Sequence, residues 1–258
     1  MKRRRGQTTL FIILGVLLLL SVVLYVAMNY VLKEKSEQQS KKELETTAEN
    51  LPIKAFVDSC VTQTAKVALF LFGFVGGGVT PEAYEMSFAY DGRYKIPYLY
   101  REGKAVFLTS SFVENTLERY VDSKLQKCTG DFSGFPDAHV IGEKPRTKAQ
   151  VLENEVFFTV TYPLTVERGE KKSMLGPAFS THVPLRMKEI LLLANEIVAL
   201  KQQDQDLIHW DYLTEITRKG YNVTAYAEVN STIVYRLVDN TYELLGEPYV
   251  FQFAVKIK

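Results

Sequence analysis

The densest group of side chains that can perform acid–base chemistry lies between residues 204 and 211. Asp204, Asp206, His209 and Asp211 fall within eight residues, and a carboxylate beside an imidazole can act as a general acid–base pair. The same positions are typical of a helix start, where aspartate accepts hydrogen bonds from free backbone amides. The group therefore supports two interpretations, a hydrolytic site and a capped, solvated helix, and we favour the second.

Other side chains that catalyse reactions or bind metals are scattered. His139 and His182 lie far apart, and no histidine belongs to a metal motif such as HExxH. The sequence also lacks the GxSxG nucleophile motif, and neither cysteine has an obvious histidine partner. We therefore expect no catalytic residue, no cofactor and no metal ion, and a protein that is not an enzyme.

The two cysteines, Cys60 and Cys128, suit a structural role. An even number of cysteines in an oxidising compartment favours a disulfide, and closing a loop of about 70 residues contributes about 4 kcal/mol in the chain-entropy model. Each cysteine falls on the apolar face of an expected helix, so both would point into one core. We expect a disulfide between them, with two buried free thiols as the alternative.

The start of the chain determines the compartment. Four cations, Lys2 to Arg5, precede 26 residues without a formal charge, Gln7 to Leu32. A helix of that length rises about 39 Å, more than the roughly 30 Å hydrocarbon core of a bilayer. The cations favour a cytoplasmic N-terminus, so we expect a single-pass protein of the cell membrane with its C-terminal part outside the cytoplasm.

The remaining composition is that of a globular domain on a tether. Removing the four leading cations from the 31 basic residues leaves 27 against 30 acidic residues, so we expect no nucleic-acid partner. Residues 33–52 are almost wholly polar and predict a helical stalk that Pro52 should end, with a flexible tether as the alternative. The expected organisation is a leader and membrane helix at 1–32, a stalk at 33–52 and an extracytoplasmic domain at 53–258, with two halves at 53–150 and 151–258 as an alternative division of that domain.

Hydropathy periods predict an α+β domain of antiparallel sheet with packed helices. Helices are expected over Lys54–Phe72, from a capping box at Ser111–Glu114 to Cys128, over Leu185–Leu200, and in a second helix that Asp204 or Asp206 caps and Gly220 ends. Strands are expected over Tyr84–Tyr90, Tyr94–Tyr100, Ala105–Leu108, Val156–Val166, Lys171–Val183, Tyr221–Val229, Ile233–Val238 and Tyr249–Ile257. A turn is expected at Arg168-Gly169-Glu170. Residues 129–150, rich in glycine, proline and charge, predict a long surface connection.

Two features concern the outer surface. Asn222-Val-Thr224 and Asn230-Ser-Thr232 match the acceptor pattern of N-glycosylation, and Asn222 should face solvent because it alternates with the apolar Val223. The 15 tyrosines fall mostly at strand positions, where aromatic residues pack well. Surface tyrosines can also make adhesive contacts, which is the alternative to core packing.

The segment Arg5-Gly6-Gln7-Thr8-Thr9-Leu10-Phe11, followed by the apolar run, resembles archaeal class III, prepilin-like signal peptides. The resemblance implies cleavage between Gly6 and Gln7 and an apolar helix that becomes the core of a filament. Phe11 stands where that family usually has the glutamate that pairs with the neighbouring subunit. The resemblance therefore implies processing of the leader more strongly than assembly of the protein into a filament.

More of the chain resembles a group of uncharacterised archaeal membrane-anchored proteins. The shared features are the GQTTLFIILG start, the segment Phe56–Cys60, the glycines Gly76–Gly78, the strand Ile96–Tyr98 and the final segment Tyr249–Ala254. This resemblance implies an archaeal cell surface. We expect a non-enzymatic surface protein that contacts other surface proteins, glycans or its own copies; the alternatives are a pilin-like subunit and a membrane-tethered hydrolase.

Overall fold

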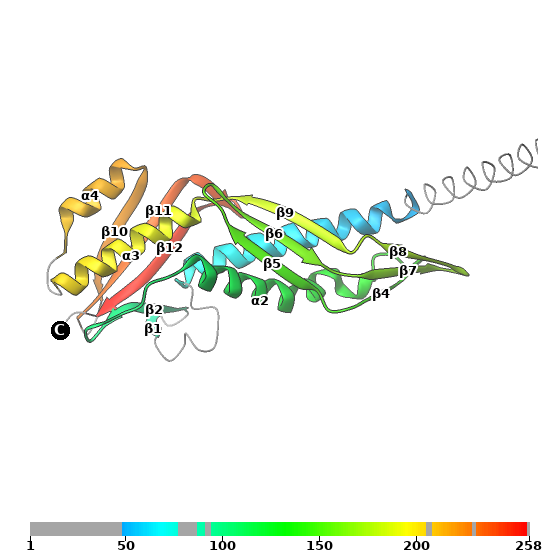
Figure 1. The fold of residues 1–258 in the computed structure, drawn as a ribbon, viewed down its shortest axis with the longest axis horizontal. Coiled ribbons are helices and arrows are strands. Elements are labelled where there is room, and N and C mark those ends of the chain that lie inside the picture. Colours follow the sequence, from blue (N-terminus) through cyan, green and yellow to red (C-terminus); the bar gives the residue numbers. More distant parts are fainter. Residues whose placement is uncertain (1–47, 77–86, 91–93, 205–207, 229–230, 257–258) are drawn as a thin grey trace, which may run out of the picture. The chain divides into compact units, whose positions relative to one another are not determined.

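The computed structural model describes residues 48–76, 87–90, 94–204, 208–228 and 231–256 (Figure 1). Contacts divide the chain into two units, Met1–Pro52 and Ile53–Lys258. The second unit combines helices with largely antiparallel sheets and is therefore an α+β fold. The expected membrane helix, the stalk up to residue 47 and the Gly6–Gln7 site lie outside the described residues.

The first described element is a long helix, Ala48–Phe74, called here the core helix. It is the one helix in the described part of the chain that is long and apolar enough to cross a membrane. One stripe of it is fully buried within the domain and comprises Ile53, Val57, Cys60, Val61, Ala65, Ala68, Leu69 and Phe72. Because this stripe packs against the sheets and the helix α2 (Ser110–Thr129), we assign the core helix to the interior of the domain.

The core helix runs through Pro52, so the expectation that Pro52 ends the stalk helix is wrong. A proline inside a helix removes one backbone hydrogen bond and costs about 3 kcal/mol. Burial of Ile53 and Val57, each 0 % exposed, offsets that cost, since a fully buried aliphatic side chain contributes about 1.5–3 kcal/mol.

The largest sheet has the strand order β1-β2-β12-β11-β10, with β3 also paired to β2. Its strands are β1 (Ser87–Tyr90), β2 (Tyr94–Arg101), β3 (Lys104–Ala105), β10 (Tyr221–Glu228), β11 (Thr232–Leu244) and β12 (Glu247–Lys256). The neighbours are antiparallel except β2 and β12, which are parallel, so the expectation of a purely antiparallel sheet is wrong for this pair. The two strands come from opposite ends of the domain, and hydropathy periods carry no information on their relative direction.

The end of the core helix lies directly on β12. Phe72 stacks on Phe251 with ring centroids 6.2 Å apart, and Gln252 Nε2 donates a hydrogen bond to the carbonyl of Phe74. A Cβ atom at Gly73 would overlap the carbonyl oxygen of Val250. Glycine is therefore required here by the close approach of two backbones.

Gly73→Ala is expected to lower the free energy of unfolding by about 2 kcal/mol or more, because the helix must move away from β12. Gly134→Ala is the matched control, since a Cβ at Gly134 meets nothing within 4 Å. Urea titration of both variants would measure the difference. Equal midpoints for the two variants would contradict the proposed close approach.

A long hairpin forms the second layer. It consists of β6 (Glu155–Thr161), β7 (Leu164–Arg168), β8 (Lys171–Leu175) and β9 (Ala178–Pro184), and it turns at Gly169 as the sequence predicts. The two single strands expected over Val156–Val166 and Lys171–Val183 are each divided in two. Pro163 and Pro177 lie at the divisions, where a residue without an amide hydrogen cannot continue the ladder.

The two ends of this hairpin belong to different three-stranded sheets, β4-β7-β8 and β5-β6-β9. Their third strands, β4 (His139–Gly142) and β5 (Arg146–Val151), lie in the stretch expected to be a surface connection. That expectation is wrong because β5 is stabilised by partners distant in sequence, β6 and α2.

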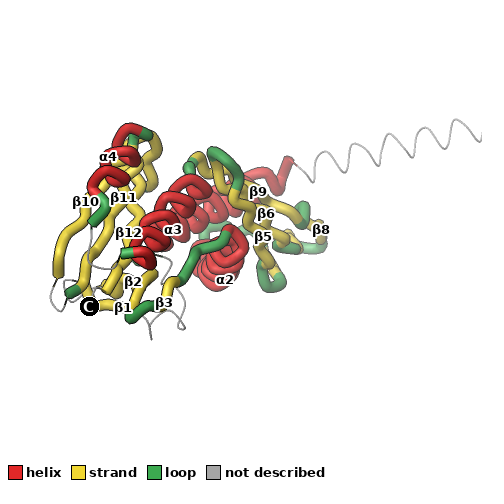
Figure 2. Tube along the Cα trace, turned by 60° about the vertical axis from the view of Figure 1, so that its left-hand side comes forward, coloured by secondary structure: helices red, strands yellow, loops and turns green. Residues whose placement is uncertain are grey.

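The other helices are α2 (Ser110–Thr129), α3 (Met187–Gln203) and α4 (Trp210–Arg218), and a short 3-10 turn, η2 (Gly130–Phe132), follows α2. Figure 2 shows α3 and α4 along one face of the largest sheet. The capping box expected at Ser111–Glu114 is wrong: Thr109 is the cap, and its Oγ1 accepts a hydrogen bond from the Phe112 amide at 3.2 Å. Several hydroxyl residues stand in a row there, so the sequence alone does not select the cap.

Glu114 is used elsewhere, together with two further acids of α2. The backbone amides of Val151, Ala149 and Thr147 in β5 donate to Glu114 at 2.9 Å, Glu118 at 3.1 Å and Asp122 at 2.7 Å, respectively. We call this set the carboxylate ladder. It occupies alternate amides along the outer edge of β5 with side chains spaced four residues apart on the helix.

Candidate docking groove

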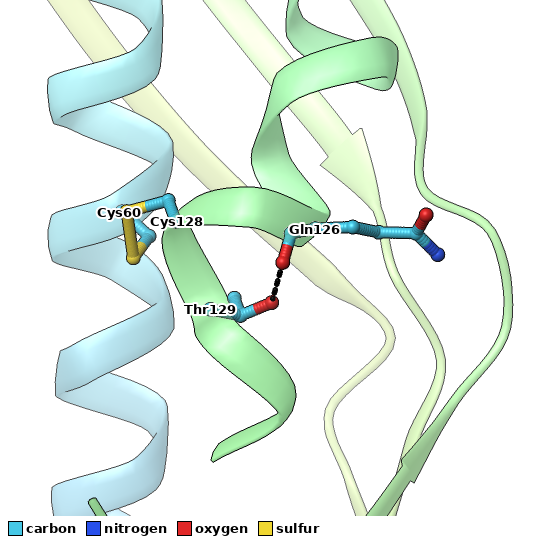
Figure 3. The surroundings of a disulfide bond; sticks show 4 residues. All are labelled: Cys60, Gln126, Cys128 and Thr129. Atoms are coloured by element: carbon cyan, nitrogen blue, oxygen red, sulfur yellow. Dashed lines mark hydrogen bonds between the residues drawn. A yellow bond between two sulfur atoms is a disulfide. The ribbon is translucent and has the colours of Figure 1, made fainter. Parts of the chain in front are cut away.

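Cys60 and Cys128 join the core helix to the end of α2 (Figure 3). Their Sγ atoms lie 2.14 Å apart and their Cα atoms 5.7 Å apart, the geometry of a disulfide. Cys60 is 3 % exposed, whereas Cys128 is exposed, so the expectation that both cysteines point into the core is wrong for Cys128. The difference arises because α2 ends at this point: Thr129 Oγ1 donates to the Gln126 carbonyl at 3.1 Å and Gly130 adopts a left-handed conformation.

The described members of the acidic cluster near His209 lie at the ends of two helices. Asp204 follows the last turn of α3, His209 precedes α4, and Asp211 is exposed in the first turn of α4; Asp206 lies outside the described residues. His209 occupies the N-cap position of α4 and its side chain makes no capping hydrogen bond, so the expectation that Asp204 or Asp206 stands at that position is wrong. His209 Nε2 is buried without a hydrogen-bond partner in the described part of the chain, and no group of three His, Cys, Asp or Glu residues gathers within that part.

Of the two glycosylation motifs, the first is described. Asn222 is exposed on β10, as its alternation with Val223 predicts, while Asn230 lies outside the described residues. Every tyrosine whose burial the structure describes is buried or half-buried, which confirms core packing for those residues.

A groove of about 500 Å³ is formed entirely by residues that the structure describes. Its walls are the segment before α2, the β5–β6 turn and the first half of α3, and its lining includes Leu108, Thr109, Glu153, Lys188, Leu191 and Asn195. These three segments are far apart in the sequence. The hairpin and α3 hold them together, because the Leu185 amide after β9 donates to the Asn154 carbonyl in the turn at 2.9 Å.

Five of the seven polar side chains that line the groove are already engaged within the protein. Asn195 binds the backbone of Leu108 twice, accepting from its amide at 2.9 Å and donating to its carbonyl at 2.8 Å. Lys188 forms an ion pair with Glu153, and Thr109 caps α2. The groove therefore has little free hydrogen-bonding capacity for a strongly polar ligand.

Four exposed apolar side chains belong to the segments that form this groove or adjoin those segments in sequence. Leu192, 55 % exposed, lines it, and Phe107, Phe112 and Leu152 are close sequence neighbours of lining residues. These four, called here the apolar rim, are almost half of the nine large apolar side chains that are exposed in the described part of the chain. Exposed apolar residues around a concave surface are typical of protein interaction sites.

A buried ionic network fixes the start of α3. The Arg186 guanidinium donates to both carboxylate oxygens of Asp239 in β11, at 2.7 and 3.0 Å, and Asp239 is 0 % exposed. Arg186 also lies 4.3 Å from the Tyr221 ring centroid, and the Tyr221 hydroxyl donates to Glu189 at 2.7 Å. The hydrogen bond to Asp239 raises the pKa of Arg186, and burial, followed by the bond to Glu189, raises the pKa of Tyr221, so both stay protonated.

The sequence contained one usable signal for this groove. The stretch Leu185–Leu200 is apolar on more than one side, and Leu192 lies on the side that the core does not cover. The other walls carried no local signal, since β5 and its turn were not expected.

Comparison of this chain with protein-family models, with curated proteins and with solved structures finds no match.

Proposed function

We propose that this chain is a single-pass membrane protein of the cell surface. In this proposal Gln7–Leu32 spans the membrane and the unit Ile53–Lys258 lies outside the cytoplasm, where it binds an apolar segment of another protein in the docking groove. The observation that carries the binding role is the apolar rim on the segments that form a groove in which five of seven polar side chains are already paired. That combination favours a peptide segment with apolar side chains over a glycan, which needs free hydrogen-bonding groups.

The proposed orientation has two further supports. The cations at residues 2–5 favour a cytoplasmic N-terminus. The paired Cys60 and Cys128 suit an oxidising compartment, because disulfides persist outside the cytoplasm. Protease added to intact cells should therefore digest the C-terminal unit, and complete protection of that unit would reject the orientation.

The groove is tested with a photoreactive amino acid placed at Leu192 in cells that produce the full chain. We expect a protein adduct at Leu192 and none from the same residue at Met174, which is 74 % exposed on β8 and far in sequence from the groove. Leu152→Asp should reduce the adduct about tenfold or more, because a charge replaces an apolar contact at the rim. Equal adducts at both positions, or an adduct indifferent to Leu152→Asp, would reject a specific docking site.

A second candidate function is that of a pilin-like filament subunit processed after Gly6. It is favoured by the core helix, whose apolar stripe anchors it in the globular domain as a filament subunit's helix requires. Intact-mass spectrometry of the mature protein distinguishes this candidate. A chain that begins at Gln7 supports processing, and one that begins at Met1 excludes it.

A further inference from the structure

The edge strands of this protein differ in how well they are protected from pairing with another chain. The edge strands in the described part of the chain are β1, β3 and β10 in the largest sheet and β4, β8, β5 and β9 in the two smaller sheets. An edge strand presents unpaired amides and carbonyls that can pair with another chain, and proteins usually block such edges. The means that block an edge include a short strand, charged side chains and proline.

Most of these edges are short or blocked. β1, β3, β4 and β8 have two to five residues, and β8 begins with Lys171 and Lys172. β9 follows Pro177 and ends at Pro184, and proline cannot donate to a ladder. The amides along the outer edge of β5 are occupied by the carboxylate ladder.

β10 is the longest of these edges and carries none of these devices. Its eight residues, Tyr221–Glu228, include no proline, lysine or arginine, and all eight pair in unbroken register with β11. Asn222 and Thr224 are exposed on one face, whereas Val223 and Ala225 are half-buried and pack against the core. One edge of the strand is therefore paired regularly with β11, and the other edge has no strand partner in the described part of the chain.

The helix that contacts β10 carries an exposed aromatic side chain. The helix α4, which contacts β10, begins with Trp210, the single tryptophan of the chain, and Trp210 is 61 % exposed. Exposed tryptophan is uncommon on surfaces that bind nothing and is enriched at the centres of protein interfaces. The edge and the tryptophan together indicate an interface.

We propose that β10 pairs antiparallel with β10 of a second copy of this chain, which joins the two largest sheets into one. A continuous sheet of this kind has its twofold axis perpendicular to the sheet, and the axis must pass midway between two opposed copies of one residue. Centred on Thr224, the register sets Thr224 opposite its own copy, Val223 opposite Ala225, and Asn222 opposite Tyr226. Residues 221–226 carry no charge, so no like charges meet, and opposed threonines are a favourable cross-strand pair.

A cysteine placed at the axis tests the register in the full chain, purified in detergent micelles. Two Thr224→Cys residues would have Cβ atoms about 4.5–5.5 Å apart and should form an intermolecular disulfide on mild oxidation. The control is Asn222→Cys, on the same exposed face, because its two copies would lie about 14 Å apart and cannot bridge. Both changes remove the same glycosylation motif, so any effect of a glycan is matched.

On a non-reducing gel, Thr224→Cys is expected to shift from 29.4 kDa to a species of twice that mass, and Asn222→Cys is expected to stay monomeric. Equal crosslinking of both variants would indicate random collision and overturn the proposal. Absence of crosslinking in both, or crosslinking of Asn222→Cys alone, would overturn it as well.

A charged variant supplies an independent measurement. Thr224→Lys sets two lysines against each other at the axis and should raise the dissociation constant of the dimer about tenfold or more, measured by light scattering of the full chain. Ser180→Lys, at an exposed position of β9, should leave the dimer intact. A wild-type chain that is monomeric at every concentration, or equal effects of the two lysines, would overturn the pairing.

Discussion

Replacing Cys60 and Cys128 together by alanine is expected to lower the free energy of unfolding by about 4 kcal/mol. The disulfide closes a loop of 68 residues, and the chain-entropy model assigns a loop of that length about this much stabilisation through the unfolded state. For a domain of this size the melting temperature should fall by about 10 °C, measured by thermal unfolding followed by circular dichroism.

Reduction of the wild-type protein with dithiothreitol is the control for the double alanine variant. Cys128 is exposed at the end of α2, so the reductant can reach the bond in the folded protein. Reduced wild type and the double alanine variant should have the same melting temperature, and the reductant should leave the variant unchanged. A wild-type protein indifferent to dithiothreitol and equal in stability to the variant would contradict the predicted contribution.

Asp239→Asn is expected to lower the free energy of unfolding by about 3 kcal/mol. Asp239 is fully buried and accepts two hydrogen bonds from Arg186 and one from the Thr241 amide at 2.9 Å. Removing one partner of a buried ion pair leaves the other charge uncompensated, which costs more than the pair itself contributes. Urea titration gives the change, and the start of α3 should become accessible to proteases first.

Two further variants identify the cause. Glu189→Gln should cost less than about 1 kcal/mol, because Glu189 is more exposed and lies 3.6 Å from Arg186. Arg186→Met added to Asp239→Asn should cost little more than Asp239→Asn alone, since the unpaired charge is then removed. Fully additive losses from the two substitutions would show that Arg186 and Asp239 act independently.

Local patterns in the sequence were sufficient for the elements that depend on them. The apolar stripe after Lys54, the turn at Gly169, the apolar stretch that forms α3 and the end of α4 before Gly220 were all predicted, because each is determined by neighbours a few residues away. β5 was missed for the opposite reason. Its residues Arg146–Val151 include two cations and a glutamine, and its amides are satisfied by acids of α2 some 25 to 37 positions earlier.

The groove shows the same division. Leu192 carries a local signal, an apolar residue on a side of α3 that the core does not need. Asn195 carries none, because its two hydrogen bonds reach the backbone of Leu108, 87 residues earlier in the chain. The ion pair of Arg186 with Asp239 could not be predicted either. An arginine before a helix and an aspartate in a strand are each common, and only the fold brings these two side chains together.

The carboxylate ladder also has a natural length. Four residues of α2 rise about 6.0 Å, whereas two residues of β5 advance about 6.7 Å, so helix and strand drift apart by about 0.7 Å with each step. The three rungs are joined by two such steps, so the accumulated drift of about 1.4 Å stays within the reach of an acidic side chain. The next positions on α2 are Ser110 and Gln126, neither of which is acidic, so the ladder has three rungs.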